Sequence, residues 1–316
     1  MSQLTLNALT AVLAESLRSR PLELRITTRE HFGASLLDFG VEVPGGLAAG
    51  IALARLCLAN LGDVSIQAAS TDVTVPEVFV RTDHPLKACL LSQYAGWKIA
   101  TDSYFAMGSG PARAVVATEE LFREFSVEEK SDTSVVILES GQVPDESAVQ
   151  LMKSAVGEGC RLIIAVAPTA SQAGNLQVVA RSVETAMHKL HELKFPVECV
   201  LSGTGSAPLP PVAKNDLEGI GRTNDSILYG STVNLWVDCE DDVIQEFGPQ
   251  TPSSSSDSHG ESFLSLFKAA NHDFYALDRN LFSPAVVCFH NVNSGRSFSY
   301  GHKVPELLCQ SFGIES

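Results

Sequence analysis

The sequence predicts a protein of the α/β class, and two observations carry this prediction. Several short segments are apolar along their whole length, and longer segments with helical periodicity lie between them. Continuous apolar strands separated by helices are typical of sheets that are covered on both faces. A chain of 316 residues is long enough for two domains or for one large α/β domain.

The first part of the chain mixes helices and strands. The expected elements are, in order, a helix over 3–18, strands over 22–26 and 35–39, a helix over 47–60, a strand over 75–80, and helices over 86–94 and 111–125. Pro21 ends the first helix, and Pro44-Gly45-Gly46 breaks the chain before the long helix rich in Ala and Leu.

The remainder contains strand-and-helix units followed by a more irregular region. We expect strands over 133–138, 162–167, 197–201, 232–237, 284–290 and 296–301, and helices over 145–156, 177–193 and 303–312. A serine-rich surface loop is expected at 252–259, and Asn293-Ser294-Gly295 is expected to turn the chain between the last two strands. This last strand-turn-strand-helix pattern is similar to that of residues 22–60, which suggests a weak repeat or a domain formed from both chain ends.

Composition excludes some classes of partner. The formal net charge is −15, whereas nucleic-acid binding needs a basic face, and the same charge argues against docking on anionic membranes. Residues 1–7 lack a basic region followed by an apolar core, and no apolar run approaches the roughly twenty residues of a membrane helix. We therefore expect a cytoplasmic protein.

The cysteines do not indicate a metal or a disulfide framework. All seven are scattered, and no two have C-x-x-C spacing. Most lie in apolar runs, so buried thiols in a reducing compartment are expected. Because no second His or carboxylate stands at ligand spacing from Asp83-His84, no metal site is expected there.

Two blocks, 80–97 and 105–113, concentrate charged, hydroxyl, amide, aromatic and glycine residues. Loops with this composition are where a rigid scaffold usually carries its chemistry. In Gly108-Ser109-Gly110-Pro111, proline suits the first helical position, and the glycines let backbone N–H groups converge on an anion or a polarised carbonyl. A plain turn that needs glycine accounts for the same pattern.

Arg181 and Glu184 form a second candidate site. Their spacing of three places both side chains on one face of the expected helix 177–193, among apolar or small neighbours. The pair is either a structural ion pair or a carboxylate that an adjacent guanidinium orients for proton transfer. Burial raises a carboxyl pKa, and a nearby cation lowers it, so the sequence leaves the sign of the shift open.

Three polar segments are further candidates. Asp83-His84-Pro85 follows a strand, Pro168–Asn175 follows a buried strand, and Gly221–Asp225 reads as a polar turn. In open α/β sheets, ligands tend to bind at the carboxyl ends of strands. Gly203-Thr204-Gly205 lacks the third glycine of a dinucleotide fingerprint, and prolines block the helix that would follow, so we reject that motif. The sequence contains neither Gly-x-Ser-x-Gly nor a P-loop.

Several long motifs resemble those of the methenyltetrahydromethanopterin cyclohydrolase family. The resemblance runs almost end to end and is carried by Asp38–Gly46, Thr82–Pro85, Ser92–Trp97, Tyr104–Ala114, Val166–Ser171, Ala180–Leu190 and Gly221–Gly230. Ser231 stands where the family often has glycine, which is a mild departure.

The resemblance implies two α/β domains, with mixed sheets flanked by helices and a pterin-binding cleft between them. It implies reversible hydrolysis of 5,10-methenyltetrahydromethanopterin to the 5-formyl derivative in one-carbon metabolism, without a metal or redox cofactor. Homo-oligomers, trimers among them, are implied as well. We expect one domain from residues 1–128 plus 228–316, and another from 129–227 that carries the helix of Arg181 and Glu184.

Within this resemblance, Glu184 is the candidate that handles the proton of the attacking water, and Arg181 the one that orients it. The candidate substrate-binding residues are Asp83, Ser92, Gln93, Tyr94, Gly108, Ser109, Gly110, Thr169, Ser171, Thr223, Asn224 and Asp225. Two alternatives stay open: a pterin-binding paralogue without activity, and a cyclohydrolase that acts on tetrahydrofolate.

Overall fold

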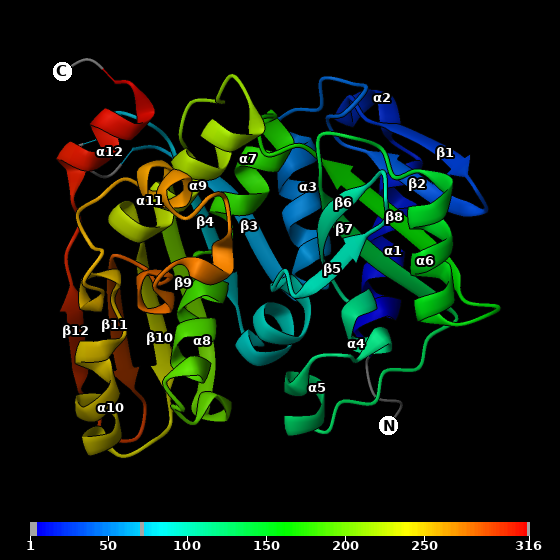
Figure 1. Cartoon of the computed structure of the whole chain (residues 1–316). Helices are drawn as coiled ribbons and strands as arrows, with labels where there is room; N and C mark the ends of the chain where they lie inside the picture. The colour runs from blue at the N-terminus through cyan, green and yellow to red at the C-terminus, as the bar shows by residue number, and fades with distance from the viewer. Residues whose placement is uncertain (1–4, 70–72, 315–316) are drawn as a thin grey trace. The chain divides into compact units, whose positions relative to one another are not determined.

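The computed structural model describes residues 5–69 and 73–314, and the chain divides into two compact units. Unit 1 comprises residues 1–62 and 87–177, and unit 2 comprises 63–86 and 178–316. Each unit contains one six-stranded mixed sheet with helices against it (Figure 1), so the expected α/β class with two mixed sheets is confirmed.

The units group the chain differently from the expected ranges 1–128 plus 228–316 and 129–227. The buried strands expected at 133–138 and 162–167 belong to the sheet of the N-terminal residues, because the strand at 161–167 pairs in parallel with the strand at 34–38. The C-terminal strands pair instead with the strand at 200–208.

Unit 1 contains the sheet β1-β2-β8-β7-β6-β5. Its strands are β1 (Thr27–His31), β2 (Ala34–Asp38), β5 (Trp97–Ala100), β6 (Phe105–Ser109), β7 (Thr133–Glu139) and β8 (Arg161–Ala167). Its helices are α1 (Leu6–Arg18), α2 (Pro21–Leu24), α3 (Leu47–Cys57), η1 (Leu86–Gln93), α4 (Ala112–Val116), α5 (Glu120–Glu124), α6 (Glu146–Val156) and α7 (Gln172–Val179). β2, β8 and β7 run parallel, and β1, β6 and β5 are antiparallel additions at the edges.

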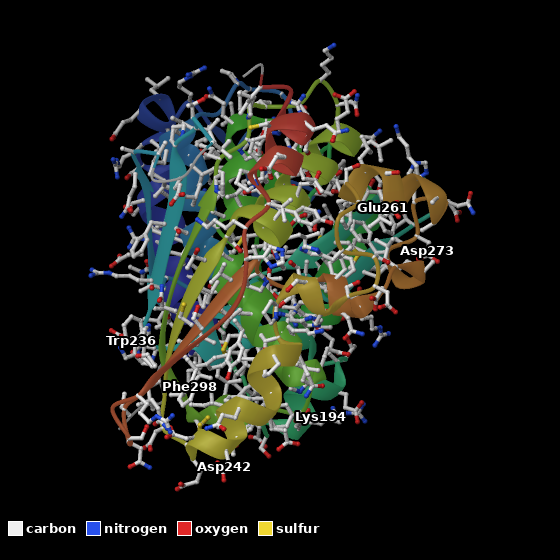
Figure 2. The ribbon with its side chains drawn as sticks, turned by 90° about the vertical axis from the view of Figure 1, so that its left-hand side faces the viewer. Lys194, Trp236, Asp242, Glu261, Asp273 and Phe298 are labelled. Atoms are coloured by element: carbon white, nitrogen blue, oxygen red, sulfur yellow. The ribbon has the colours of Figure 1, made fainter. Side chains whose placement is uncertain are left out.

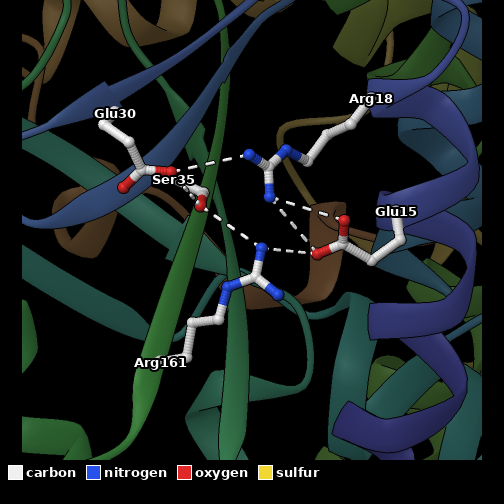
Figure 3. Close-up of polar contacts among 5 residues, drawn as sticks. All are labelled: Glu15, Arg18, Glu30, Ser35 and Arg161. Atoms are coloured by element: carbon white, nitrogen blue, oxygen red, sulfur yellow. Dashed lines mark hydrogen bonds and ion pairs between the residues drawn. The ribbon is translucent and has the colours of Figure 1, made fainter.

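Both faces of this sheet are buried, as continuous apolar strands predict. Ile163 and Ala165 of β8 pack with α1 and α3 on one face, whereas Leu162 and Ile164 pack with α6 on the other (Figure 1). Polar contacts also hold α1 to the strands, and one group of them is drawn in close-up (Figure 3). There Glu15 of α1 accepts from Arg161 of β8 at 2.5 Å, and Arg161 reaches Ser35 of β2 at 3.4 Å (Figure 3).

Unit 2 contains the sheet β12-β11-β10-β9-β4-β3. Its strands are β3 (Gly62–Gln67), β4 (Glu77–Thr82), β9 (Val200–Pro208), β10 (Thr232–Val237), β11 (Val286–Asn291) and β12 (Ser297–Gly301). Its α-helices are α8 (Ser182–Glu192), α9 (Asp216–Gly230), α10 (Asp241–Phe247), α11 (Phe263–Ala269) and α12 (Pro305–Phe312). Its 3-10 turns are η2 (Val197–Cys199), η3 (Gly248–Gln250), η4 (Ser253–Ser255), η5 (Phe274–Ala276) and η6 (Arg279–Leu281).

The two faces of this second sheet differ. Along β10, Val233, Leu235 and Val237 are buried, and the alternating Trp236 is 36% exposed. Figure 2 shows Trp236 on the side of the sheet away from Asp242 of α10. The alternation follows from the period of two in a strand, with one face toward the helices.

Several expected elements have different limits. Residues 22–26 were expected as a strand. Instead, residues 22–24 belong to the short helix α2, and Pro21, at the first position of this helix, favours a helix start there. The helix expected over 111–125 is two short helices, because Ala117 is left-handed with φ 47° and ends α4. The strand expected over 197–201 is a 3-10 turn followed by β9, which continues through the glycines to Pro208. Residues 3 and 4 of the first expected helix lie outside the described residues.

The cysteines and the longest helices bear on two other expectations. Cys57 and Cys89 are buried, whereas the other five cysteines are partly exposed, so burial of most of them was overestimated. Across residues 5–69 and 73–314, no helix is both long and apolar enough to cross a membrane.

Candidate functional site

Arg181 lies at a break between two helices. α7 ends at Val179, and the N–H of Arg181 donates to Val178 O at 3.0 Å, which closes the turn. The Arg181 carbonyl then accepts from Thr185 N at 2.8 Å and begins α8. The single helix expected over 177–193 is therefore two helices, because this tight turn interrupts the regular helical ladder.

The break gives Arg181 and Glu184 distinct positions on α8. Arg181 is the N-cap residue, and Glu184 is the third residue of the helix, in its first turn. Both side chains are buried, with 7% and 6% exposure. The unsatisfied N–H groups and the dipole at a helix N-terminus stabilise a negative charge there. The structure thus brings the two candidate catalytic residues to the same end of one helix.

Asp83 lies in unit 2 just after β4 and is exposed. Its Oδ1 accepts from Ser202 Oγ of β9 at 2.8 Å, and the N–H of His84 donates to Thr82 Oγ1 at 3.0 Å. These contacts hold the end of β4 beside β9. Asp83 is therefore available at the surface of the unit, on the loop that the sequence indicated.

The segment Gly221–Asp225, expected as a turn, lies inside α9. Asn215 caps this helix by accepting from Glu218 N at 3.0 Å. Thr223 Oγ1 and Asn224 Nδ2 donate to carbonyls one turn earlier, at 2.9 and 2.8 Å. The helix tolerates Gly221 because it packs closely on α11, where an added Cβ would lie 2.9 Å from Leu264 Cβ.

Asp225 is fully buried on α9, and both of its carboxylate oxygens accept hydrogen bonds. Oδ1 accepts from Phe263 N at 2.8 Å, and Oδ2 accepts from Ser311 Oγ at 2.6 Å. Burial raises the pKa of this carboxyl to about 6, against the lowering effect of its two donors. These contacts connect α9 to α11 and α12, so they are sufficient to explain the presence of Asp225.

Within the block 80–97, residues Leu86–Gln93 form η1, a π-helix of eight residues. Tyr94 N donates to Cys89 O at 2.9 Å, which is the wide i to i+5 pattern of such helices. Ser92 and Gln93 are buried, and Ser92 Oγ donates to Cys57 O at 2.6 Å. π-helical turns are rare and frequently occur at functional sites.

The glycine block adjoins this helix directly. Gly108 and Ser109 end β6, and Gly110 follows with φ +91°, a left-handed conformation that favours glycine. Gly110 N donates to Ser92 O at 2.8 Å, so this amide binds the π-helix. The helix after it, α4, has only five residues, so the long helix N-terminus expected for anion binding is not formed here.

Arg113 joins the two blocks, and the sequence reasoning missed its role. Its Nη1 donates to the carbonyls of Leu90 and Ser92, each at 3.2 Å, and its guanidinium lies 5.0 Å from the Tyr94 ring centroid. Its other nitrogens bind both carboxylate oxygens of Glu119 at 2.9 and 2.6 Å. A single arginine within an otherwise small and apolar segment was the available signal.

Thr169 and Ser171 follow β8, at the carboxyl end of a buried parallel strand as expected. Both are buried. Ser171 Oγ accepts from Gly174 N at 3.0 Å and donates to Pro168 O at 2.8 Å, so it caps the start of α7. On the neighbouring β2, Asp38 accepts from the N–H groups of Gly40, Val41 and Glu42 at 2.7–2.9 Å. The loops after β8 and after β2 therefore lie together at the carboxyl ends of two neighbouring parallel strands.

The candidate residues therefore fall into two sets, one in each unit. Unit 1 holds Ser92, Gln93, Tyr94, Gly108, Ser109, Gly110, Thr169 and Ser171, and unit 2 holds Asp83, Arg181, Glu184, Thr223, Asn224 and Asp225. Within the described residues, no group of three or more His, Cys, Asp or Glu side chains is arranged to hold a metal ion.

Comparison with known sequences decides the family. A family model described as "Cyclohydrolase (MCH)" matches residues 5–312. The chain belongs to this cyclohydrolase family. Family membership and the hydrolase class, both expected from the motifs, are thereby confirmed.

Relatives named methenyltetrahydromethanopterin cyclohydrolase match nearly end to end. The protein of Rhodopirellula baltica is 45% identical over 307 residues, which cover 95% of this chain and 92% of the relative. That of Methylobacillus flagellatus is 40% identical over 315 residues, with 99% and 96% covered. That of Methanosarcina mazei is 40% identical over 301 residues, with 94% of each chain covered. The match therefore includes both units of the cyclohydrolase fold described above.

Proposed function

We propose that this chain reversibly hydrolyses 5,10-methenyltetrahydromethanopterin to 5-formyltetrahydromethanopterin. The observation that carries the proposal is a buried Arg181–Glu184 turn at the start of α8 in a chain of the cyclohydrolase family. The relatives named for this reaction match over both units, so the residues that recognise the substrate and those that transform it fall within the matched length.

The chemistry makes a modest demand on the protein. The methenyl carbon lies between two nitrogens in a delocalised cation, so it is already electrophilic and needs no covalent nucleophile. Water adds to this carbon and loses one proton, which gives a neutral carbinol. The C–N bond then breaks as the released nitrogen takes up that proton, and the hydroxyl loses the second proton to solvent as the formyl C=O forms. A base that accepts the first proton and returns it completes the cycle. The proposed reaction accordingly uses no metal and no redox cofactor.

Glu184 is the proposed proton carrier. Its carboxylate takes the proton from the attacking water and delivers it as the C–N bond breaks. Its place in the first turn of α8 supports this role, because the helix N-terminus stabilises the carboxylate form that begins the cycle. Burial at 6% exposure limits competing bulk water.

Arg181 is the proposed orienting group. As the N-cap residue it precedes Glu184 by three positions, and a guanidinium at that distance in sequence reaches the same helical turn. Its planar donor array suits a carboxylate, which it holds in one orientation. Arg181 thus acts on the geometry of Glu184.

The proposed binding residues come from both units. Ser92, Gln93 and Tyr94 of the π-helix and Gly108, Ser109 and Gly110 beside it are proposed to contact the pterin or the coenzyme tail. Asp83, Thr169, Ser171, Thr223, Asn224 and Asp225 are proposed as additional contacts, of which Asp83 is the exposed carboxylate. Amide and carboxylate groups of this kind complement the hydrogen-bonding edge of a pterin.

The proposed setting is cytoplasmic one-carbon metabolism, in formaldehyde oxidation or carbon dioxide reduction. The protein is proposed to work there as a homo-oligomer, with a trimer as one form.

The test is spectrophotometric. Purified protein is added to methenyltetrahydromethanopterin, and the methenyl absorbance is followed, with methenyltetrahydrofolate in a parallel cuvette. We expect rapid bleaching of the methanopterin substrate. Bleaching of the folate alone would identify a folate cyclohydrolase. Binding without bleaching above the buffer rate would identify a non-catalytic pterin-binding paralogue and overturn the proposal.

A further inference from the structure

The first turn of α8 rests directly on β9, at two glycines. A Cβ built on Gly205 would overlap Ser182 Oγ and would lie 3.1 Å from both Ser182 Cβ and Val183 Cγ2. A Cβ on Gly203 would lie 2.9 Å from Val183 Cγ1. Neither glycine has a positive φ, so both are needed for space and not for backbone conformation. This is the role of the Gly203-Thr204-Gly205 segment: close approach of a helix to a strand.

Within residues 5–69 and 73–314, the Ser182 hydroxyl at this contact has no hydrogen-bond partner. Ser182 is fully buried, and its Oγ is unsatisfied. An unsatisfied buried hydroxyl lowers stability, and such costs are concentrated at functional sites. The contact is therefore not explained by stability alone.

Ser182 and Val183 are the two residues between Arg181 and Glu184. They form the first and second positions of α8, and the candidate catalytic residues are its N-cap and its third position. Any displacement of Ser182 and Val183 away from β9 moves both candidate residues with them, because one helical turn moves as a unit. Displacements of about 1 Å at a catalytic group can cost about 100-fold in rate.

We propose that Gly205 is a positioning residue: its contact with Ser182 and Val183 sets the position of the Arg181–Glu184 turn for the hydrolysis. This inference rests on the proposed function of Glu184. Gly205 itself touches no reacting atom. It acts by allowing α8 to lie close against the sheet.

The first variant is Gly205→Ala. Rotation of the Ser182 hydroxyl relieves only the closest contact. Ser182 Cβ and Val183 Cγ2, at 3.1 Å, must still yield by a few tenths of an ångström, so we expect the first turn of α8 to move away from β9. We expect kcat for the methenyl substrate to fall about tenfold or more, with a smaller change in KM. The second variant, Ser182→Gly in the Gly205→Ala background, removes the opposing side chain and is expected to restore most of kcat.

Gly230→Ala is the matched control. A Cβ there would also be crowded, at 2.8 Å from Pro208 and 2.9 Å from Leu308, but it faces other elements of unit 2 and not α8. We expect this variant to lower Tm and to leave kcat near the wild-type value. A loss of kcat that tracks Tm across all variants would show a merely structural role and overturn the proposal.

Two further results separate the possible failures. If wild-type protein bleaches the substrate and folded Gly205→Ala keeps wild-type kcat, the positioning role is overturned while the proposed function stands. If wild-type protein does not bleach the substrate, the proposed function fails. Amide exchange over residues 180–186 then still tests whether Gly205→Ala displaces the first turn of α8 and whether Ser182→Gly restores it. Should Gly205→Ala not fold, Ser182→Thr adds one methyl at the same contact, and an unchanged kcat in that variant would equally overturn the proposal.

Discussion

α8 and α9 both carry a buried acidic residue in unit 2, and they hold it at different positions along the helix. Glu184 lies in the first turn of α8, beside an arginine at the N-cap. Asp225 lies well inside α9, and its two oxygens accept from Phe263 N and Ser311 Oγ. The difference teaches that burial and a polar sequence motif do not identify a catalytic carboxylate. The position along the helix distinguishes the two carboxylates.

Replacing Glu184 by Gln is the strongest test of this comparison. Glutamine keeps the shape of the side chain but cannot carry the proton, so we expect kcat to fall about 10²–10⁴-fold. Tm should change little, because the volume is conserved. Steady-state kinetics and a thermal melt of the same preparation check both points. Near-normal turnover would remove Glu184 from the mechanism.

Replacing Asp225 by Ala should act on stability. Phe263 N and Ser311 Oγ would both lose their acceptor in a buried site, and the free energy of unfolding should fall by about 2–4 kcal/mol. Denaturant unfolding measures this change. A rise in KM at unchanged stability would instead show that Asp225 acts mainly as the substrate contact proposed above, and not as a link between α9, α11 and α12.

The pH dependence of Asp225 sharpens the same contrast. Its folded pKa, raised to about 6 by burial, lies above the unfolded value, so the folded state binds more protons between these two values. Stability from this group is present at low pH and is lost as pH rises through about 6. The wild type should lose about 2 kcal/mol relative to Asp225→Asn between about pH 4 and 6.5. Parallel stability curves for the two proteins would contradict the assignment.

Lys189 lies farther along α8. Its effect on the pH dependence of stability is the smallest of those predicted here, and its sign is opposite to that of Asp225. Burial lowers its pKa to about 8, although Asp278 and Glu192 raise it, and its Nζ donates to Asn280 Oδ1 at 2.7 Å. The unfolded state then binds more protons between about pH 8 and 10.5, so stability rises with pH across that window. Lys189→Met should flatten this rise, by about 1–2 kcal/mol. An unaltered slope in the variant would show that Lys189 is not its source.

The sequence predicted the parts of the fold that depend on local pattern. The expected apolar runs form β7 and β8, whose alternate residues are buried on opposite faces of the sheet. As expected, Asn293-Ser294-Gly295 joins β11 to β12. The break at Arg181 was not predicted, because the residues around it are all compatible with a continuous helix. The helical state of Gly221–Asp225 was missed because packing on Leu264 overrides the low helix propensity of glycine.

The candidate site shows the same division. The motifs pointed to Arg181 and Glu184 and to the segment around Ser92, and these residues are buried as a site requires. The link between Ser92, Tyr94 and Glu119 through Arg113 depends on three segments that meet only after folding. Periodicity and spacing describe one segment at a time, so they do not predict such a junction.

The π-helix η1 places a strict limit on chain length. Each of its hydrogen-bonded rings encloses one residue more than a ring of an α-helix, so the loss of a single residue between Leu86 and Gln93 would let the segment rewind as an ordinary helix. If the segment rewound as an ordinary helix with all eight residues present, every later side chain would turn by about 100° around the axis. Ser92 would then leave the Cys57 carbonyl, and Tyr94 would leave the Arg113 guanidinium. The wide turns of η1 therefore hold Ser92 and Tyr94 at these two contacts.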